Sequence, residues 1–417
     1  MASDAESAGA DISARAREEL GFSRWWQVAA AAVMMGLVSP YQYVWTVVQQ
    51  PLGEALSIPL PALGLVFTLF VVIQSGSQFP VGWWRDRHGP RALTLAAGVL
   101  AGGGYVGLAY ATEVWQIYLL YSLGALGVGI VYTVAVNTAL KWFPDRRGLT
   151  TGVGTMAFAA GSALFVLPVR ANATAEAYGG VFLAMGAVIG VGVIAGALVL
   201  RDPPAGWMAE MVDEGGVEET TTGRQYTSRE MLRTWQFWLM YAVFVLVSAA
   251  GLMLTSLLVQ FATEFDLSAN ITTVSAVVLP IASGVGRLVI GDLSDRYDRR
   301  LTMVASFVLS GLGLFLVVWA ATGGASLVFV AAVVVSMFFW SPQFSLFPSV
   351  VADYYGHEHS SANYALLYSG KMWGGVFGGA VAGWFVLVTS WTTTFLVAGG
   401  LTVVSGLASL ALRPPER

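Results

Sequence analysis

Two cationic side chains lie inside apolar segments of this chain without an acidic neighbour. Lys371 falls in the run 363–386 and Arg287 in the run 271–293, where Asp292 only marks the exit. A charge at the centre of a bilayer costs about 3 kcal/mol on insertion scales. Two such charges are too costly to be kept for stability alone, so the pattern indicates an anionic ligand that pairs with both.

The two cations are expected at similar depths. Arg287 is six residues from the end of its run, roughly 9 Å, and Lys371 is eight residues into its run, roughly 12 Å at 1.5 Å per residue. Both can then face one ligand, although long basic side chains can instead extend toward the headgroups. A guanidinium matches a carboxylate as a planar fork, whereas an ammonium is a compact charge. The pair favours a small dicarboxylate, because a monoanion leaves a net positive site.

Aromatic and amide side chains occupy similar positions in the apolar runs. Tyr368 and Lys371 are three residues apart, and Trp340 and Phe344 are four apart, so each pair shares a helix face. Aromatic rings would wall a small flat anion and amides would line its path. The alternative for each ring is ordinary packing or a place in an interfacial belt. Besides the two cations, the expected binding residues are Tyr43, Trp45, Tyr132, Trp340, Phe344, Tyr368, Gln42 and Gln74.

The elements that carry these residues follow from the composition. Of 417 residues, 56% are hydrophobic and 11% are charged, against about 25% charged residues in a soluble protein. Twelve apolar runs can each cross a hydrocarbon core of about 30 Å as a helix. We expect an all-α membrane protein with spans at about 27–48, 61–83, 92–112, 115–140, 149–168, 178–200, 236–262, 271–293, 301–321, 326–351, 363–386 and 391–412.

Basic residues gather on one side of this topology. With the N-terminus inside, cytoplasmic tails and loops hold 18 of the 21 Lys and Arg residues, and the outer loops hold only Arg170. This positive-inside pattern predicts that both termini of a multi-pass plasma-membrane protein are cytoplasmic. The longest polar stretch divides the helices six and six. The expected units are a tail at 1–23, a bundle at 24–200, a linker at 201–235, a bundle at 236–412 and a tail at 413–417.

A matching signature follows the second and the eighth helix. Each copy has Gly, three residues, Asp and Arg, and the copies are 209 residues apart. A repeat at half the chain length is typical of transporters built from two related halves. Glycine allows close helix approach, and the Asp-Arg pair can lock one conformation by binding a neighbouring helix end, unless the loop is simply basic. The expected gating residues are Gly82, Asp86, Arg87, Gly291, Asp295 and Arg296.

This repeated loop resembles the major facilitator superfamily. Other stretches resemble its oxalate/formate antiporters: Gln42-Tyr-Val-Trp45, Gln74-Ser-Gly-Ser-Gln78, Gly129-Ile-Val-Tyr132, Lys141-Trp-Phe-Pro-Asp-Arg-Arg-Gly148 and Leu346-Phe-Pro-Ser349. The resemblance covers nearly the whole chain. It implies the major facilitator fold, in which two pseudo-symmetric six-helix bundles enclose the substrate.

The resemblance also implies a site. Oxalate carriers of the family bind substrate between an arginine of helix eight and a lysine of helix eleven, inside an aromatic cage. Five residues match that pattern: Arg287, Lys371, Tyr43, Tyr132 and Trp340. Two positions depart from it, since Phe344 stands where tyrosine is expected and Tyr368 where tryptophan is expected. The departures affect the choice among small carboxylates more than the anion class.

The expected function is exchange of small carboxylates, oxalate against formate, by a monomer that uses alternating access. The runner-up is a monocarboxylate carrier of the same superfamily, a lactate- or pyruvate-like uniporter or proton symporter. Such a carrier normally uses a titratable acid within the membrane, and no expected helix interior contains one.

Other functions lack the residues that they need. The chain has no Cys, which excludes disulfides and thiolate metal sites. His357 and His359 stand two apart in a polar loop and do not indicate a metal. A sensor is disfavoured because the longest polar segment has only about 35 residues, and an enzyme because catalytic His and paired intramembrane acids are missing. No cofactor and no nucleic-acid partner is expected.

Overall fold

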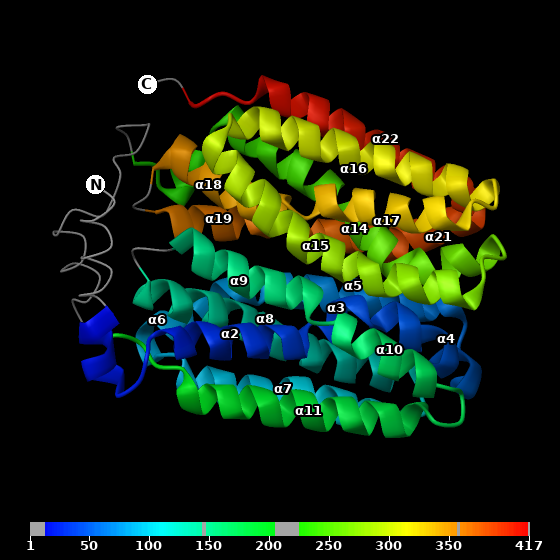
Figure 1. Ribbon diagram of the computed structural model, residues 1–417, viewed down its shortest axis with the longest axis horizontal. Helices are drawn as coiled ribbons and strands as arrows, with labels where there is room; N and C mark the ends of the chain where they lie inside the picture. Colours follow the sequence, from blue (N-terminus) through cyan, green and yellow to red (C-terminus); the bar gives the residue numbers. More distant parts are fainter. Residues whose placement is uncertain (1–12, 144–146, 205–224, 357–358, 416–417) are drawn as a thin grey trace.

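A computed structural model describes residues 13–143, 147–204, 225–356 and 359–415 (Figure 1). Some sequence expectations fall outside these residues: most of the tail at 1–23, the middle of the 201–235 linker, and His357. The side chains of Asp86 and Asp295 also lie outside the described part.

The prediction of twelve spans is confirmed. Within the described ranges, eleven helices are long and apolar enough to cross a membrane. Two further helices, Trp25–Tyr43 and Trp45–Leu56, are bent by 49° at their junction and together form one more span, the first in chain order, which brings the total to twelve. This first span runs past its expected end at 48, because the helix continues through Pro51 until Ser57 adopts a left-handed backbone conformation. The other spans match their predicted runs to within a few residues.

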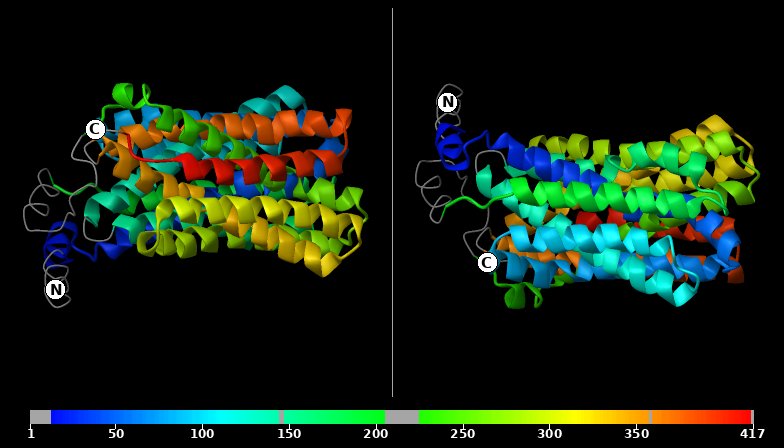
Figure 2. Two further views of the ribbon diagram at one scale, coloured as in Figure 1. Left: turned by 90° about the horizontal axis from the view of Figure 1, so that it is seen from above. Right: turned by 90° about the horizontal axis from the view of Figure 1, so that it is seen from below.

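The helices form two bundles that lie side by side (Figures 1 and 2). The N-terminal bundle contains α2 (Trp25–Val38), α3 (Pro40–Tyr43), α4 (Trp45–Leu56), α5 (Leu60–Gly76), α6 (Gln78–His88), α7 (Arg91–Leu108), α8 (Val114–Trp142), α9 (Arg147–Ala160), α10 (Ala163–Asn172) and α11 (Tyr178–Val199). After the short α13 (Ser228–Met231), the C-terminal bundle contains α14 (Trp235–Glu264), α15 (Ala269–Arg296), α16 (Arg299–Thr322), α17 (Ser326–Trp340), α18 (Gln343–Tyr355), α19 (Ser360–Tyr368), α20 (Gly370–Val376), a π-helical turn (Phe377–Val381), α21 (Ala382–Val388), α22 (Trp391–Ala408) and a final 3₁₀ turn (Ser409–Ala411). The bundles meet where α9 packs on α15 and α5 packs on α20.

The two bundles repeat one packing arrangement. In the N-terminal bundle α7 crosses α11, and a Cβ atom on Gly102 would lie 2.7 Å from the Cα of Gly190. In the C-terminal bundle α16 crosses α22, and a Cβ atom on Gly311 would lie 2.6 Å from the carbonyl oxygen of Gly399. Both glycines of the second pair follow those of the first by 209 residues. The repeat therefore extends to helix contacts in which glycine lets the backbones touch.

Five spans are interrupted along their length, and each of the five has a break that contains a serine; the first span has a second break at Val44. The serine-containing breaks lie at Ser39, Ser77, Gly161–Ser162, Ser341–Pro342 and Ser369. The Ser341 hydroxyl donates to the Ser283 carbonyl of α15. Each of the other four serines donates to the carbonyl three residues before it, on Gly36, Gln74, Ala159 and Leu366. These bonds occupy carbonyl groups near the breaks, so irregular backbone is tolerated away from water.

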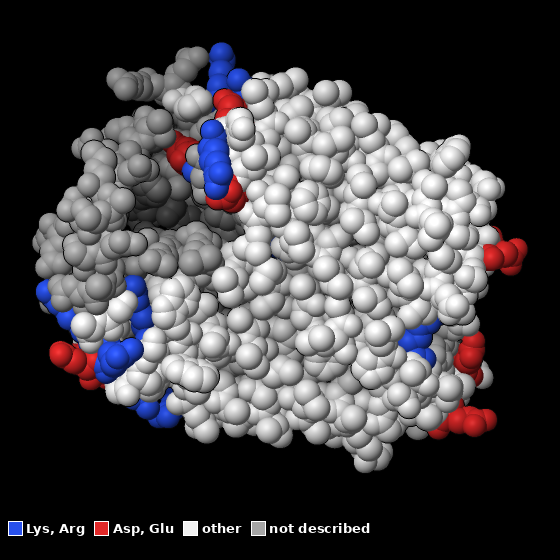
Figure 3. Space-filling view, viewed as in Figure 1, with Lys and Arg blue, Asp and Glu red and all other residues white. Residues whose placement is uncertain are grey.

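Charged side chains gather at the two ends of the molecule and leave a broad uncharged band on the face shown in Figure 3. The described chain begins (residue 13) and ends (residue 415) at the same end of the molecule (Figure 1), where α6 and α15 end and α16 begins. We call it the arginine-rich end, because Arg85, Arg87, Arg296 and Arg299 are carried there. An apolar band between charged rims is the surface that a multi-pass membrane protein requires.

Replacing Gly102 or Gly311 with Ala is expected to lower thermal stability, because the added methyl group would meet backbone atoms closer than 3 Å. Overpacking of this kind costs roughly 1–3 kcal/mol. Gly103→Ala and Gly400→Ala are matched controls, since a Cβ atom there meets nothing within 4 Å. Melting curves of the detergent-purified protein should shift down for the first two variants only. Equal curves for all four would contradict the close crossings.

Candidate functional site

Lys371 on α20 extends out of the C-terminal bundle and contacts the N-terminal bundle. Its side chain is 1% exposed. The ammonium Nζ donates to the Oε1 atoms of Gln42 on α3 and Gln74 on α5, at 3.1 Å each, and to the Tyr368 hydroxyl at 3.4 Å. Neutral oxygens from the opposite bundle therefore receive most of its hydrogen bonds.

Arg287 on α15 behaves in the same way. It is 3% exposed, its Nη1 donates to the backbone carbonyl of Thr155 on α9 at 2.9 Å, and its Nη2 donates to the Tyr43 hydroxyl at 3.4 Å. Within the described ranges no carboxylate forms an ion pair with Arg287 or Lys371. Both cationic heads are buried between the bundles, so the alternative in which they extend to the headgroups does not describe this structure.

One aromatic ring lies against both cations. The Phe344 centroid is 4.6 Å from the Arg287 guanidinium carbon and 5.6 Å from the Lys371 Nζ. Because each cation lies that close to one centroid, the two are no more than about 10 Å apart. The Tyr368 ring, also 5.6 Å from Nζ, flanks Lys371. Such cation–π contacts lower the cost of a buried charge without neutralising it.

The remaining predicted rings extend this aromatic wall across the bundle interface. Trp340 packs on Phe344 at 5.4 Å, and its indole N–H donates to the Val247 carbonyl at 2.7 Å, so that donor is already used. On the other side Tyr132 lies 6.1 Å from Tyr368. Phe158, which the sequence did not single out, joins Tyr132 at 5.3 Å and Tyr43 at 6.1 Å.

Trp45 is placed apart from the other predicted residues. Its ring packs on Tyr121 at 4.7 Å within the N-terminal bundle. The Tyr121 hydroxyl in turn donates to the Tyr41 carbonyl at 2.6 Å, beside the bend between α3 and α4. Trp45 and Tyr121 therefore pack beside the bend that follows Gln42 and Tyr43, not against the cations.

Several buried hydrogen-bond donors around the cations lack an acceptor among the described residues. The Nε2 atoms of Gln42 and Gln74 and the Nε atom of Arg287 are buried without a hydrogen-bond partner among the described residues. A buried donor left in this state costs about 1–3 kcal/mol. An ionised carboxylate accepts hydrogen bonds and donates none, so its chemistry complements this cluster.

The positive charge belongs to only one of the two repeats. At the repeat offset of 209 residues, Arg287 corresponds to Gln78 and Lys371 corresponds to Ser162. The C-terminal bundle thus supplies both cations, and the N-terminal bundle supplies neutral polar groups. The offset is the signal that could have brought Gln78 into the sequence prediction. No such signal exists for the Thr155 carbonyl, since every residue carries one.

The predicted gating residues lie at the arginine-rich end. A Cβ atom on Gly82 would be 3.7 Å from Thr133, and one on Gly291 would be 3.5 Å from Ser345, so both helices approach a neighbour there. Arg87 donates to the Trp83 carbonyl of its own helix, 3.2 Å away. Arg296 pairs with Asp292, also on its own helix, at 2.8 Å. A gating role for these residues and for Asp86 and Asp295 stays a prediction.

Other charged residues form ion pairs that connect helix ends at the arginine-rich end of the N-terminal bundle. The fully buried Arg85 bonds Asp202 at 2.6 Å and the Thr138 hydroxyl at 3.1 Å. Lys141 on α8 reaches the second oxygen of Asp202 at 3.2 Å. One carboxylate after α11 therefore joins the ends of α6 and α8, which the sequence prediction missed.

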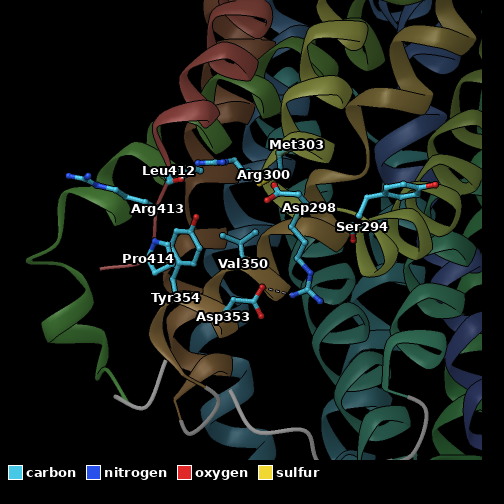
Figure 4. A pocket seen from close by; sticks show the side chains of 12 residues that line it. Ser294, Asp298, Arg300, Met303, Val350, Asp353, Tyr354, Leu412, Arg413 and Pro414 are labelled. Carbon is cyan, nitrogen blue, oxygen red and sulfur yellow. Dashed lines mark hydrogen bonds and ion pairs between the residues drawn. The ribbon is translucent and has the colours of Figure 1, made fainter. Parts of the chain in front are cut away.

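A cavity of about 460 Å³ opens at the arginine-rich end of the C-terminal bundle (Figure 4). It lies among the ends of α15 and α18, the start of α16 and the tail after α22, and none of the predicted binding residues lines it. One of its arginines has an acidic partner, since Arg299 Nη1 pairs with Asp353 Oδ2 at 2.6 Å, and Arg300 donates to the Leu412 carbonyl. The unpaired charges of the central cluster are the stronger candidate for anion binding.

Comparisons with known proteins identify a family and several named relatives. A family model described as "Major Facilitator Superfamily" matches residues 28–286 and 253–417. The chain is 31% identical over 390 residues to "Oxalate:formate antiporter" of Oxalobacter formigenes, covering 94% of this chain and 90% of that one. It is 26% identical over 341 residues to "Apicoplast pyruvate carrier 1" of Toxoplasma gondii, covering 68% and 60%.

A solved structure supports the fold alone. The crystal structure of a peptide transporter, POT, is similar with a TM-score of 0.70 at 14% identity, and the likeness covers 94% of both chains. The expected fold of two related helical bundles is therefore confirmed.

Replacing Asp202 with Asn is expected to destabilise the N-terminal bundle, because one carboxylate serves two cations and Arg85 is fully buried. Because Asp202 is 26% exposed, the loss should exceed the roughly 1 kcal/mol of an exposed pair and stay below the roughly 3 kcal/mol of a fully buried one. Asp292→Asn, which breaks an exposed pair on α15, should cost no more than about 1 kcal/mol. Melting curves of the two variants in detergent provide the measurement, and an equal shift would argue against the Asp202 cluster as a structural tie.

Proposed function

The chain belongs to the major facilitator superfamily, and on that basis we propose that it exchanges small carboxylates across a membrane, with the dianion oxalate moving against formate. It is a multi-pass integral membrane protein, and its relatives indicate a transporter rather than an enzyme. Alternating access would expose the site between the bundles first on one side of the membrane and then on the other.

The observation that carries this proposal is the pair of buried cations without acidic partners. Arg287 and Lys371 bring two positive charges to one ring, Phe344, and the described residues supply only neutral acceptors. A dianion would cancel both charges, and a monoanion would cancel one. Since an uncompensated buried charge is strongly unfavourable, the charge count favours a dianion as the tighter ligand.

Size selection follows from the same geometry. The two cations are no more than about 10 Å apart across the Phe344 ring, and the aromatic rings close the space around them. A dicarboxylate with its two carboxylates directly joined fits this span, with one end on the guanidinium fork and the other on the ammonium. The antiporter from Oxalobacter formigenes, at 31% identity, supports this substrate class.

A monocarboxylate carrier is the second candidate. The similarity to the apicoplast pyruvate carrier favours it, as does the Phe344 position, where the expected tyrosine hydroxyl is missing. A proton symporter would need a titratable acid near the site, and no described carboxylate pairs with either cation. Uptake of pyruvate or lactate that requires a pH gradient would favour this candidate over exchange.

We also propose how the protein sits in the membrane. The arginine-rich end would face the cytoplasm of the cell, in the plasma membrane, by the positive-inside rule. The bundles at 24–200 and 236–412 would rock as two units on either side of the site. The site lies between the two bundles of one chain, so a monomer would suffice.

Proteoliposomes loaded with formate should take up radiolabelled oxalate, and this uptake should fail in Arg287→Gln and Lys371→Gln. A hydrogen bond to a charged group contributes about 1.5–3 kcal/mol, so oxalate binding should weaken roughly 10- to 100-fold in either variant. Lys371→Gln should weaken oxalate more than formate, because it removes one of the two charges. Arg229→Gln, at an exposed arginine on the short α13, is the matched control. Absence of formate-driven oxalate uptake in the unmodified protein would sink the proposal.

Exchange of oxalate for formate should respond to the membrane potential, because one net negative charge moves inward for each oxalate taken up. A unit charge crossing 100 mV is worth about 2.3 kcal/mol. An inside-positive potential of that size, set with valinomycin and potassium, should raise oxalate accumulation at equilibrium about 50-fold. Accumulation that ignores the potential would instead indicate exchange of equally charged anions.

A further inference from the structure

Resting on the proposed function, we propose that Gln42 and Gln74 act as a built-in substitute for the transported anion and so give the protein a second, slower activity, net transport without exchange. Strict exchange requires that the binding site reorient across the membrane only when an anion is bound. The protein groups that contact the cations determine how often the site reorients empty.

Four hydrogen bonds join the bundles at the two cations, and each has a neutral acceptor on the N-terminal bundle. Lys371 donates to the Oε1 atoms of Gln42 and Gln74 at 3.1 Å each. Arg287 donates to the Thr155 carbonyl at 2.9 Å and to the Tyr43 hydroxyl at 3.4 Å. The chain can therefore bring its bundles together around the cations with acceptors of its own, in the place where an anion would bridge them.

An amide is suited to this double role. Its oxygen can accept from Lys371, and a rotation about its last side-chain torsion presents the NH₂ group instead, which can donate to a carboxylate. The Nε2 atoms of Gln42 and Gln74 are buried without partners, so these donors are available to an anion. A carboxylate at either position would hold Lys371 in a permanent ion pair and repel the substrate, and an apolar side chain would satisfy neither state.

The substitution is incomplete, which makes the second activity slow. Amide oxygens satisfy the hydrogen-bonding capacity of the ammonium, but they leave its charge and that of Arg287 uncompensated in a low-dielectric interface. Return with a bound dianion neutralises both charges. Exchange should therefore be faster than net transport, and the ratio of the two rates should depend on the two glutamines.

The test compares two fluxes in the same proteoliposomes loaded with radiolabelled oxalate. Dilution into buffer with saturating oxalate measures exchange, and dilution into anion-free buffer with valinomycin and potassium measures net efflux. In the Gln42→Met/Gln74→Met double variant, net efflux should fall at least 10-fold relative to exchange, because two hydrogen bonds to a charged group are lost. Each single variant keeps one acceptor and should lie between the double variant and the unmodified protein.

Gln260→Met is the matched control. Gln260 also accepts a hydrogen bond across the bundle interface, from Thr46 at 3.3 Å, but it does not contact either cation. Its ratio of net efflux to exchange should stay within about 2-fold of the unmodified protein. If this ratio falls as far as in the double variant, the effect belongs to any bond between the bundles and the inference is overturned.

Other outcomes separate this inference from the proposed function. Exchange with no net efflux above protein-free liposomes, or an unchanged flux ratio in the variants, overturns the inference and leaves exchange intact. Absence of exchange in the unmodified protein refutes the proposed function itself. If only the double variant lacks exchange, the ratio of net efflux to exchange in the two single variants provides the test.

Discussion

Arg287 and Lys371 carry two positive charges into the interface between the bundles, and none of the described acids pairs with either of them. A buried charge without a counterion is among the most unfavourable features that a protein can retain. Its hydrogen-bonding groups can nevertheless be satisfied by neutral oxygens, and here those oxygens come from the facing bundle. The cations thus bind one bundle to the other, so any change in their ligands bears directly on whether the bundles stay together.

The broken helices follow from that requirement. A continuous α-helix presents a fixed stripe of side chains and no free carbonyls, whereas a break can redirect a side chain toward the centre. Gln42 and Tyr43, which accept hydrogen bonds from the cations, lie just before the bend at Val44, and the break at Ser369 stands two residues before Lys371. Serine hydroxyls at the breaks donate to nearby carbonyls. These hydrogen bonds lower the free-energy cost of irregular backbone inside the membrane.

Sequence patterns bring together both cations and the amides Gln42 and Gln74, and the structure places these four in one cluster. Arg287 and Lys371 stand out because a charge in an apolar run has few explanations, and the 209-residue offset relates Gly102 to Gly311 as it relates the two loops. Trp45 was expected among the binding residues with Tyr43, but side chains two residues apart on a helix do not share a face. Trp45 packs against Tyr121 within the N-terminal bundle instead. Phe158 carries no signal, because a phenylalanine in a transmembrane helix is usually packing.

Both positive charges belong to the C-terminal repeat, and this affects how easily the interface between the bundles closes. If each bundle carried one cation, closing the interface would bring like charges together from opposite sides, and repulsion would oppose every closed state. With both cations on the C-terminal bundle, closure does not have to change the distance between them, although their repulsion strengthens as the interface loses water. Closure then depends on this loss of solvation and on the groups that face the cations. An anion that bridges Arg287 and Lys371 to the neutral bundle therefore acts on closure itself, and Gln78 and Ser162, the counterparts of the cations in that bundle, keep the facing surface uncharged.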